Sequence, residues 1–279
     1  MDVISFRDLR VESDSNDRLK VYSKIISSSS APSLDHRSYM LDNHFDAVLV
    51  RTMPLGSLEQ VIFRMNALHV AQKNGIAVVN SPRSLEIAID KWLTLDYARQ
   101  AGLEIPRTVC CQDRESAIEA FQLFDGDVVV KPLFGGEGRG LIRISDPDMA
   151  WRVFTTLEQI SSVIYIQEFI PHRGFDLRIL LVGDDVFCVA RHGAIGDWRT
   201  NVSRGGKAIA FHASEKQIEI ARKAAQAIGG QIVGVDILPT MDDRDILLEV
   251  NAVPGWQGTA KALNVDIAMQ VLQTITRRC

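Results

Sequence analysis

The chain has 279 residues, with 31 lysines and arginines against 35 aspartates and glutamates, and a formal net charge of −4. Hydrophobic residues make up 46% and charged residues 24%, the proportions of a soluble globular protein. This near-neutral balance argues against a dedicated nucleic-acid binder, which usually carries a strong basic excess. The length suggests about two domains and a core large enough to need no disulfides.

Neither export nor membrane insertion is expected. The opening residues, MDVISFRD, lack the basic stretch and apolar run of a signal peptide, and no uncharged apolar stretch approaches the roughly 18 residues of a membrane helix. Cys110, Cys111, Cys188 and Cys279 show neither paired nor metal-ligand spacing, so we expect free thiols in a reducing cytosol. We therefore predict a cytoplasmic protein with no membrane or nucleic-acid partner, and the sequence leaves a homo-oligomer open.

The first hundred residues alternate strands and helices. Strands are predicted over Val21–Ile26, Phe45–Val50 and Ile76–Asn80. A polar loop is predicted over residues 26–33. A helix is predicted before the third strand, because apolar residues recur at helical spacing from Leu58 to Leu68 and Gly75 follows as a stop; another helix spans residues 81–102. Strand, helix, strand at this spacing indicates a βαβ unit on a parallel sheet.

The rest of the chain has more strands, several separated by short turns. Strands are predicted over Thr108–Gln112, Val128–Lys131, Leu141–Ser145, Val163–Ile170, Leu177–Val182, Val186–Arg191, Gly234–Pro239 and Ile246–Asn251. Helices are predicted over Ala117–Phe124, Met149–Ile160, Glu215–Ile228 and Asp266–Arg277. The sequence therefore predicts an α/β unit followed by an α+β region, joined near residues 81–90.

A glycine-rich loop follows the strand that ends at Lys131. Its glycines let the backbone come close to a bound group and point N–H donors at phosphate oxygens, for which the lysine supplies a charge. The Walker A loop is excluded, because the only Gly-Lys pair, Gly206-Lys207, is followed by Ala208. The dinucleotide fingerprint is excluded because a strand follows the loop instead of a helix. Two interpretations remain, a hairpin flap over phosphates and a surface turn.

Three oxygen-bearing residues form a candidate metal site. Glu249 and Asn251 stand two apart on one strand, so their side chains share a face, and Asp236 interrupts an otherwise apolar strand upstream. If the two strands form a hairpin, these oxygen ligands converge in a set suited to Mg²⁺. The alternative is that Asp236 caps or pairs locally and Glu249 faces water, although a carboxylate in an apolar strand is costly unless it is compensated.

Cationic residues gather further along the chain, around Trp198. Guanidinium groups bind carboxylate and phosphate oxygens bidentately, so this set suits an acidic substrate and a transferred phosphoryl group. The alternative for each residue is a solvated loop charge. The set comprises Arg178, Arg191, His192, Arg199, Arg204 and Lys207.

Together these segments resemble the ATP-grasp superfamily and, within it, the RimK-like carboxylate–amine ligases. Seven segments match in unbroken order over roughly residues 80–279: Lys91; Lys131-Pro132 with the glycine flap; Gln167–Ile170; Asp176–Arg178; Trp198–Gly206; Gly234–Asp236; and Leu248–Gly255. The resemblance implies a small Rossmann-like pre-ATP-grasp domain over residues 1–85 and an ATP-grasp domain over 86–279, with lobes at about 86–168 and 169–279.

The resemblance also implies a reaction and its residues. A carboxylate is activated as an acylphosphate and an amine attacks it, giving an amide, ADP and phosphate with two Mg²⁺ ions, for which Mn²⁺ can substitute. The implied ATP-binding residues are Lys91, Lys131, Gly135, Gly136, Gly138, Gln167, Glu168, Phe169, Ile170, Asp176, Arg178 and Asn201. The implied metal ligands are Asp236, Glu249 and Asn251, and Arg191 and Arg199 would stabilise charge on the transferred phosphate.

The acceptor side departs from RimK itself. RimK has two adjacent arginines where this chain has Arg191-His192, several relatives carry Ser or Thr at Gly136, and Asn-x-Ser-Pro-Gly is Asn251–Gly255 here. The segments 51–58 and 253–256 are similar to ATP-grasp proteins of tetrahydromethanopterin-type coenzymes, so we expect glutamate to be added to a small acidic metabolite. Candidate substrate-binding residues are Arg51, Met53, Arg204, Gly205 and Trp256. A ribosomal-protein tail as acceptor, an ATP-grasp kinase and a non-catalytic ATP-binding scaffold remain the alternatives.

Overall fold

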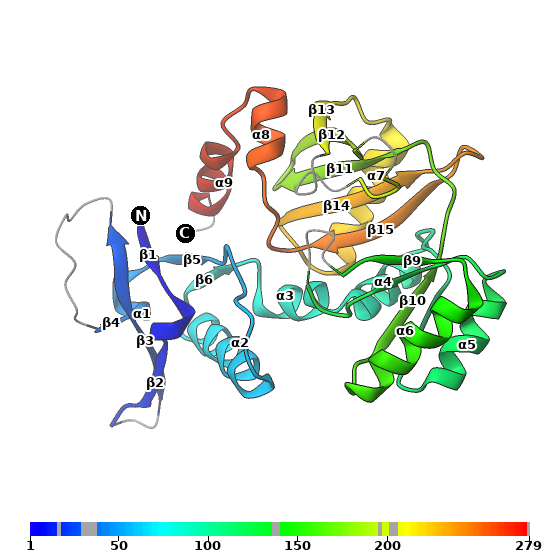
Figure 1. Cartoon of the computed structure of the whole chain (residues 1–279). Helices are drawn as coiled ribbons and strands as arrows, with labels where there is room; N and C mark the ends of the chain where they lie inside the picture. The colour runs from blue at the N-terminus through cyan, green and yellow to red at the C-terminus, as the bar shows by residue number, and fades with distance from the viewer. Residues whose placement is uncertain (16–17, 29–37, 136–139, 195–196, 201–205, 278–279) are drawn as a thin grey trace. The chain divides into compact units, whose positions relative to one another are not determined.

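A computed structural model covers the chain and describes all residues except 16–17, 29–37, 136–139, 195–196, 201–205 and 278–279 (Figure 1). Its contacts divide the chain into two compact units, residues 1–86 with 268–279 and residues 87–267. The division expected from the sequence placed residues 268–279 with the larger domain, whereas these contacts group them with the smaller unit.

The smaller unit combines an antiparallel sheet with a βαβ unit. Three strands pair with the long strand β3 (Leu19–Ser28): β1 (Asp2–Ile4), β2 (Arg10–Ser13) and β4 (Ser38–Met40). The short helices are η1 (Phe6–Asp8) and α1 (Leu41–His44). β5 (Ala47–Leu49) and β6 (Ala77–Val79) pair in parallel across α2 (Leu58–Lys73), which confirms the predicted βαβ unit. The predicted loop over residues 26–33 begins inside β3, and its residues 29–33 lie outside the described part of the chain.

Local chemistry fixes where the helices begin. Ser57 caps α2 in a reciprocal capping box with Gln60. The helix predicted over residues 81–102 is wrong as a single element, because α3 (Pro82–Ile89) and α4 (Lys91–Gln100) are separate. Asp90 divides them: its backbone is extended and its carboxylate accepts the N–H groups of Trp92 and Leu93, so a new helix begins there.

The first lobe of the larger unit is a four-stranded antiparallel sheet with two helices on one face (Figure 1). Its order is β7 (Thr108–Cys111), β10 (Ile164–Glu168), β8 (Val128–Lys131) and β9 (Ile142–Ile144). The helices α5 (Arg114–Leu123) and α6 (Pro147–Gln159) supply Phe121 and Phe154 to a core that they share with Val128 and Ile164. This core holds the end of β8, and hence Lys131, in a fixed place.

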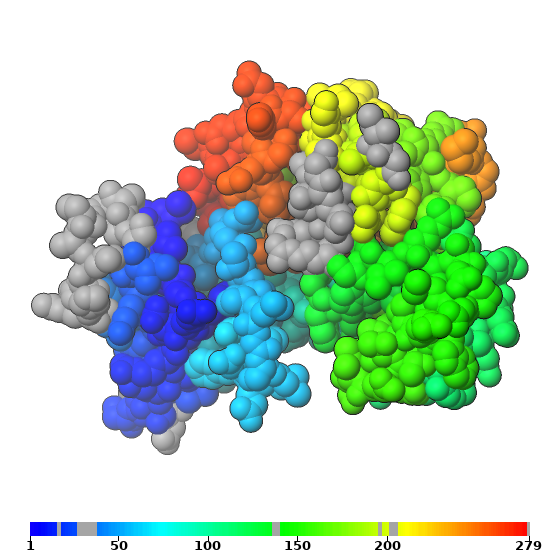
Figure 2. Space-filling model, viewed as in Figure 1, coloured from blue at the N-terminus to red at the C-terminus, as the bar shows by residue number. Residues whose placement is uncertain are grey.

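The second lobe is a five-stranded antiparallel sheet. Its order is β13 (Lys207–Ala210), β12 (Asp185–His192), β11 (Phe175–Val182), β14 (Ile232–Pro239) and β15 (Asp245–Asn251). The helix α7 (Glu215–Ala227) contacts β11, β14 and β15, while α8 (Gln257–Leu263) contacts β12 and β13. β14 is buried along its whole length, and it pairs with β15 in an antiparallel hairpin, the arrangement on which the candidate metal site depended. In Figure 2 this lobe runs from yellow-green to orange and the first lobe is green.

The last helix, α9 (Ile267–Thr276), lies close to its predicted range. The elements that were not predicted are α8 and β13 in the larger unit and β1, β2, β4, η1 and α1 in the smaller one. α8 has only seven residues and begins at Trp256 without a side-chain cap, so little in the sequence marks it. Among the described residues, no helix is long and apolar enough to cross a membrane.

Candidate active site

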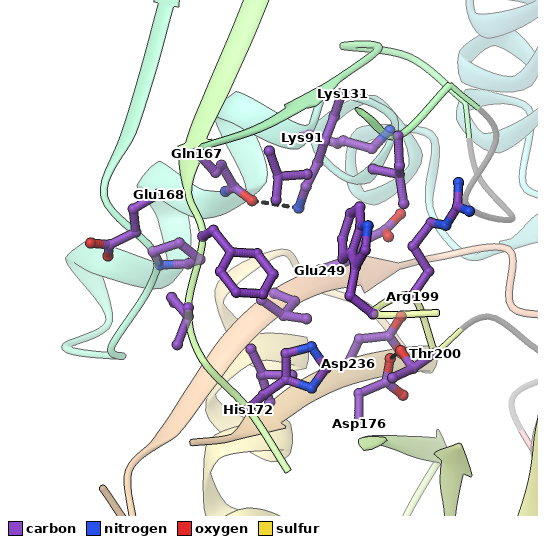
Figure 3. Close-up of a pocket in the computed structure, with 18 of the residues that line it drawn as sticks. Lys91, Lys131, Gln167, Glu168, His172, Asp176, Arg199, Thr200, Asp236 and Glu249 are labelled. Carbon is purple, nitrogen blue, oxygen red and sulfur yellow. Dashed lines mark hydrogen bonds between the residues drawn. The ribbon is translucent and has the colours of Figure 1, made fainter. Parts of the chain in front are cut away.

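A pocket lies between the two lobes of the larger unit, and both sheets contribute to it (Figure 3). The first lobe and the strand leading out of it supply Lys91, Pro106, Val129, Lys131, Pro132, Gly135, Leu141, Gln167, Glu168, Phe169 and Ile170. The second lobe and its loops supply His172, Asp176, Trp198, Arg199, Thr200, Asp236, Leu238, Leu248 and Glu249. The pocket therefore combines an apolar wall with facing groups of opposite charge.

Two lysines provide the positive charge on the first-lobe side. Lys131 ends the buried strand β8, and Lys91 is the first residue of α4 after the Asp90 cap. Burial lowers the pKa of Lys131 to about 8, against the opposing attraction of Glu249, and burial also lowers the pKa of Lys91. The Lys91 ammonium donates to the carbonyl oxygens of Leu133 and Gly135, so it braces the start of the glycine loop.

Both described ends of the glycine loop need glycine. Gly135 has φ 115° and Gly140 has φ 74°, backbone conformations that L side chains rarely adopt. A Cβ on Gly140 would also lie 2.7 Å from Cγ of Pro132, because the returning chain crosses that proline closely. Gly136 and Gly138, which were predicted to bind ATP, lie outside the described residues.

The strand β10 and the residues after it form one wall. Gln167 is 2% exposed, and its side chain accepts a hydrogen bond from Lys131. The carboxylate of Glu168 instead accepts bonds from the backbone N–H and Nε of Arg107, at 2.8 and 2.6 Å, and points away from the other labelled side chains (Figure 3). Phe169 lies under the Arg143 guanidinium, 3.4 Å from its ring centre, with Trp198 edge-on at 5.9 Å. An aromatic ring is thus held rigidly beside the pocket.

Below the pocket, two carboxylates and two guanidinium groups form a buried network. Arg191 donates to Asp176 at 2.6 and 2.8 Å and to Asp236 at 2.8 Å, and Arg178 also donates to Asp236. Burial alone would raise the pKa of Asp236, but the two guanidiniums outweigh it and hold this pKa at about 2. Thr200 donates to Asp176, which ties the loop after β12 to the network. Asp236 is therefore ionised at neutral pH.

Strand register produces this network. Asp176 on β11 stands opposite Arg191 on β12, and Arg178 on β11 stands opposite Asp236 on β14. Directly opposite residues in antiparallel strands have side chains on the same face of the sheet. The alternation of Asp176 and Arg178 along β11 thus places each next to a partner of opposite charge.

The proposed metal ligands share one face of the same sheet. Glu249 stands opposite Asp236, and Asn251 opposite Gly234, so all three side chains lie on one side of β14 and β15. Lys131 feels the charge of both carboxylates, which places them near the pocket's cationic side. Among the described residues, no group of three or more His, Cys, Asp or Glu side chains could hold a metal ion. Two carboxylates and an amide would suit Mg²⁺ if phosphate oxygens and water completed its shell. In this structure the Asp236 carboxylate is bound by Arg178 and Arg191, and Asn251 accepts the N–H of Val253.

A profile of the RimK-like ATP-grasp domain matches residues 88–275 of this chain. The chain belongs to the RimK-like ATP-grasp family. Among the curated relatives of this RimK-like protein, the tetrahydromethanopterin:alpha-L-glutamate ligase of Methanosarcina acetivorans is 32% identical over 84% of this chain and 81% of that protein. A probable alpha-L-glutamate ligase of Citrobacter koseri is 33% identical over 94% of this chain and 85% of that protein.

Solved structures show the same fold. The RimK domain protein of Sphaerobacter thermophilus has a TM-score of 0.65 at 20% identity, covering 88% of this chain and 84% of that one. The ATP-grasp ligase PsnB, solved with a variant of its minimal precursor, Mg and ADP, has a TM-score of 0.65 at 21% identity, covering 96% of this chain and 85% of that one. The RimK-like protein is thus an ATP-grasp ligase that forms C–N bonds and releases ADP, within a family whose named members include glutamate ligases.

The structure gathers eleven of the residues singled out from the sequence around the pocket of this RimK-like protein: Lys91, Lys131, Gly135, Gln167, Glu168, Phe169, Ile170, Asp176, Arg199, Asp236 and Glu249. Arg178 and Arg191 instead bind the carboxylates of the network, and the side chain of Asn251 accepts the N–H of Val253 at 2.8 Å. Trp256 precedes α8 and does not line the pocket. Arg51 and Met53 belong to the smaller unit, and Asn201, Arg204 and Gly205 lie outside the described residues.

Sequence reasoning missed His172, which lines the pocket next to Phe169. Its Nδ1 accepts the N–H of Gly174 at 3.2 Å, and its ring also bonds to the backbone of Trp198. Burial lowers its pKa, so the ring is neutral at pH 7. His172 therefore fastens the Trp198 segment to the chain leaving β10, a role that has no signature in the sequence because both partners are backbone groups.

Proposed function

We propose that this protein joins glutamate to the carboxylate of an acidic acceptor, using ATP and Mg²⁺ and passing through an acylphosphate. The observation that carries the proposal is that two lysines from one lobe, Lys91 and Lys131, face two carboxylates from the other, Asp236 and Glu249, in a single pocket. Phosphoryl transfer depends on positioning and charge neutralisation, for which lysines, arginines and Mg²⁺ are suited.

Within this proposal the pocket divides into three regions. The apolar wall of Val129, Leu238 and Leu248, with the backbone of residues 167–170, would receive the adenine and ribose. Lys91, Lys131 and the glycine loop would contact the phosphates. Asp236, Glu249 and Asn251 would hold two Mg²⁺ ions or Mn²⁺ in their place, which would neutralise phosphate charge when bound.

The arginines would serve the transferred phosphate and the acceptor. Arg199 lines the pocket, with its guanidinium held by Asp197 at 2.9–3.2 Å. Arg191 is bound to Asp176 and Asp236, so contact with the phosphate would require it to exchange one of these partners. Asp176, Arg178 and Asn201 would complete the nucleotide side of the site.

The acceptor is proposed to be a coenzyme precursor of the tetrahydromethanopterin type. The support is the 32% identity to a tetrahydromethanopterin ligase over 84% of this chain. Arg51, Met53, Arg204, Gly205 and Trp256 are the proposed acceptor-binding residues. Although the PsnB structure contains a peptide precursor, its 21% identity supports the fold alone and does not favour a peptide acceptor here.

The proposal is tested by incubating the purified protein with Mg-ATP, a pool of amino acids and a small-molecule extract that contains reduced pterins. ADP, phosphate and new masses are read together. ADP and phosphate with a metabolite heavier by one glutamyl residue support the ligase and identify its acceptor. ADP with a metabolite heavier by one phosphate would instead establish a kinase, and tight Mg-ATP binding without any ADP would contradict catalysis on these substrates.

Two variants test the site. Lys131→Ala should weaken Mg-ATP binding while the fold stays intact. An unchanged affinity for the nucleotide would show that Lys131 does not bind it. Glu249→Gln should reduce turnover more than nucleotide binding, because a metal-held carboxylate matters most as charge develops. Near-normal turnover of Glu249→Gln would show that the metal set has been misassigned.

A further inference from the structure

A branched chain of hydrogen bonds starts at Lys131 in the pocket wall and joins five groups. The Lys131 ammonium donates to Oε1 of Gln167, and Nε2 of Gln167 donates to the hydroxyl of Thr108 at 2.9 Å. That hydroxyl donates in turn to the carbonyl oxygen of Pro106, also at 2.9 Å. The second Nε2 hydrogen goes to the hydroxyl of Tyr165 at 2.9 Å.

The two ends of this chain fix its direction. A carbonyl oxygen such as that of Pro106 can only accept, so the single hydrogen of the Thr108 hydroxyl is committed to it. Thr108 can then only accept from residue 167, which requires the amide nitrogen of Gln167 on that side. The amide oxygen is left facing Lys131, whose ammonium can only donate. The network itself therefore assigns the orientation of the amide.

Burial makes this arrangement rigid. Gln167 is 2% exposed and Tyr165 1% exposed, so a broken bond here would leave an unpaired buried polar group. Tyr165 and Gln167 are two apart on β10, and their side chains share a face. Register places Tyr165 opposite Lys131 on β8 and Gln167 opposite Thr108 on β7. Gln167 and Tyr165 from β10 and Thr108 from β7 thus form the network that holds Lys131 of β8.

We propose that the side chain of Gln167 is a positioning residue for Lys131, held in its working orientation by Thr108 and Tyr165. This inference rests on the proposed nucleotide-binding role of Lys131. It also explains why Thr108 and Tyr165 place hydroxyl groups next to Gln167. One of the three ammonium hydrogens is used by Gln167, which leaves two for phosphate oxygens. Because the ammonium is placed before the nucleotide arrives, less side-chain freedom is lost on binding.

The test measures binding of Mg-ADP and of adenosine, neither of which requires the acceptor. Gln167→Met removes the acceptor at similar side-chain length, and it should raise the Kd of Mg-ADP at least tenfold while adenosine binding changes less than twofold. Gln167→Glu keeps an acceptor for Lys131 but has no N–H for Thr108 and Tyr165, so its Kd for Mg-ADP should lie between those of the parent and Gln167→Met. Gln122→Met, on the exposed surface of α5 in the same lobe, is the matched control and should change neither Kd.

Tyr165→Phe provides a second variant if Gln167→Met folds poorly, as judged by circular dichroism. Thr108 still holds the amide in this variant, so Mg-ADP binding should weaken only about threefold, again without an effect on adenosine. Equal weakening of ADP and adenosine by either variant would overturn the proposal, because it would indicate general damage to the pocket.

A double-mutant cycle with Lys131→Ala separates this inference from the proposed function. If Gln167 acts through Lys131, Gln167→Met should have no further effect on Mg-ADP binding once the lysine is gone. An undiminished effect in that background would overturn the positioning role alone. Unchanged ADP affinity in Lys131→Ala by itself would overturn both the nucleotide role of Lys131 and this inference.

Discussion

Replacing Asp236 with asparagine tests the energetic role of the buried charge network. The parent residue is 5% exposed and compensates Arg178 and Arg191. Removing one partner of a buried ion pair typically costs about 3–5 kcal/mol, because the remaining charge stays desolvated. Asparagine keeps the shape of the aspartate side chain and one hydrogen-bond acceptor. We therefore expect the free energy of unfolding at pH 7 to fall by about 3 kcal/mol, the lower end of this range.

The pH dependence of unfolding gives a second estimate of how much the ionised Asp236 contributes to the free energy of unfolding. The folded-state pKa of Asp236 is about 2, against an ordinary value of 3.8. This difference corresponds to roughly 2 kcal/mol, present above pH 4 and lost as the pH falls through the folded pKa. Stability falls at low pH because, between these two pKa values, the unfolded chain binds the proton and the folded chain does not. The asparagine variant lacks this contribution. The difference in free energy of unfolding between the parent and the variant should therefore be about 1 kcal/mol smaller at pH 3 than at pH 7.

The measurement is urea unfolding followed by circular dichroism at pH 7 and pH 3, without nucleotide or Mg²⁺, since bound ligands would add stability of their own. Asp243→Asn is the matched control, because this aspartate also pairs with an arginine, Arg173, but its side chain is 83% exposed. It should lose less than about 1 kcal/mol at pH 7. A loss below about 1 kcal/mol for Asp236→Asn, or a gap that is the same at both pH values, would refute the reasoning.

Three further predictions concern single features. Burial raises the pKa of Cys110 to about 12 and that of Cys111 to about 11. Both thiols should therefore react slowly with a thiol reagent at pH 8 until urea unfolds the chain. Rapid labelling of either cysteine in the native protein, located by peptide mass, would contradict this. Gly140→Ala should weaken Mg-ATP binding severalfold and lower the free energy of unfolding by about 1–2 kcal/mol, because the backbone there is left-handed and the added methyl meets Pro132. An unchanged Kd would show that the loop accommodates the methyl. Asp90→Ala removes the cap of α4 and should lower the free energy of unfolding by about 1 kcal/mol in urea, and a loss within error would mean that water replaces the cap.

Long apolar runs made much of the fold predictable. β8 has the predicted bounds, Val128–Lys131, because three consecutive buried valines leave few alternatives to a strand. The strands β14 and β15 were predicted from two apolar runs separated by polar residues, whereas their pairing was only assumed. The elements that sequence reasoning missed have weaker patterns. β13 has four mostly exposed residues, and α8 starts without a capping side chain, so neither periodicity nor a helix signal marks them.

The candidate site divides along a similar line. Lys131, Asp236 and the glycines were conspicuous because they interrupt apolar strands or concentrate flexible backbone in one loop. Gln167 was identified by resemblance alone, and its contact with Lys131 depends on how β7, β8 and β10 are aligned. His172 gave no signal, because its hydrogen bonds go to backbone groups whose position only the folded chain defines.

Asp236 shows why a local pattern was informative and still incomplete. A carboxylate in an apolar strand indicated a compensating partner, and the sequence offered a metal ion or a local pairing. The structure supplies Arg178, 58 residues upstream on the paired strand β11, and Arg191 from β12, the strand beyond it. A shift of β11 by one residue would turn Arg178 to the opposite face of the sheet and leave Asp236 with one guanidinium. Strand register therefore keeps Asp236 ionised beside two guanidinium groups, and a metal ion bound there would have to share the carboxylate with them.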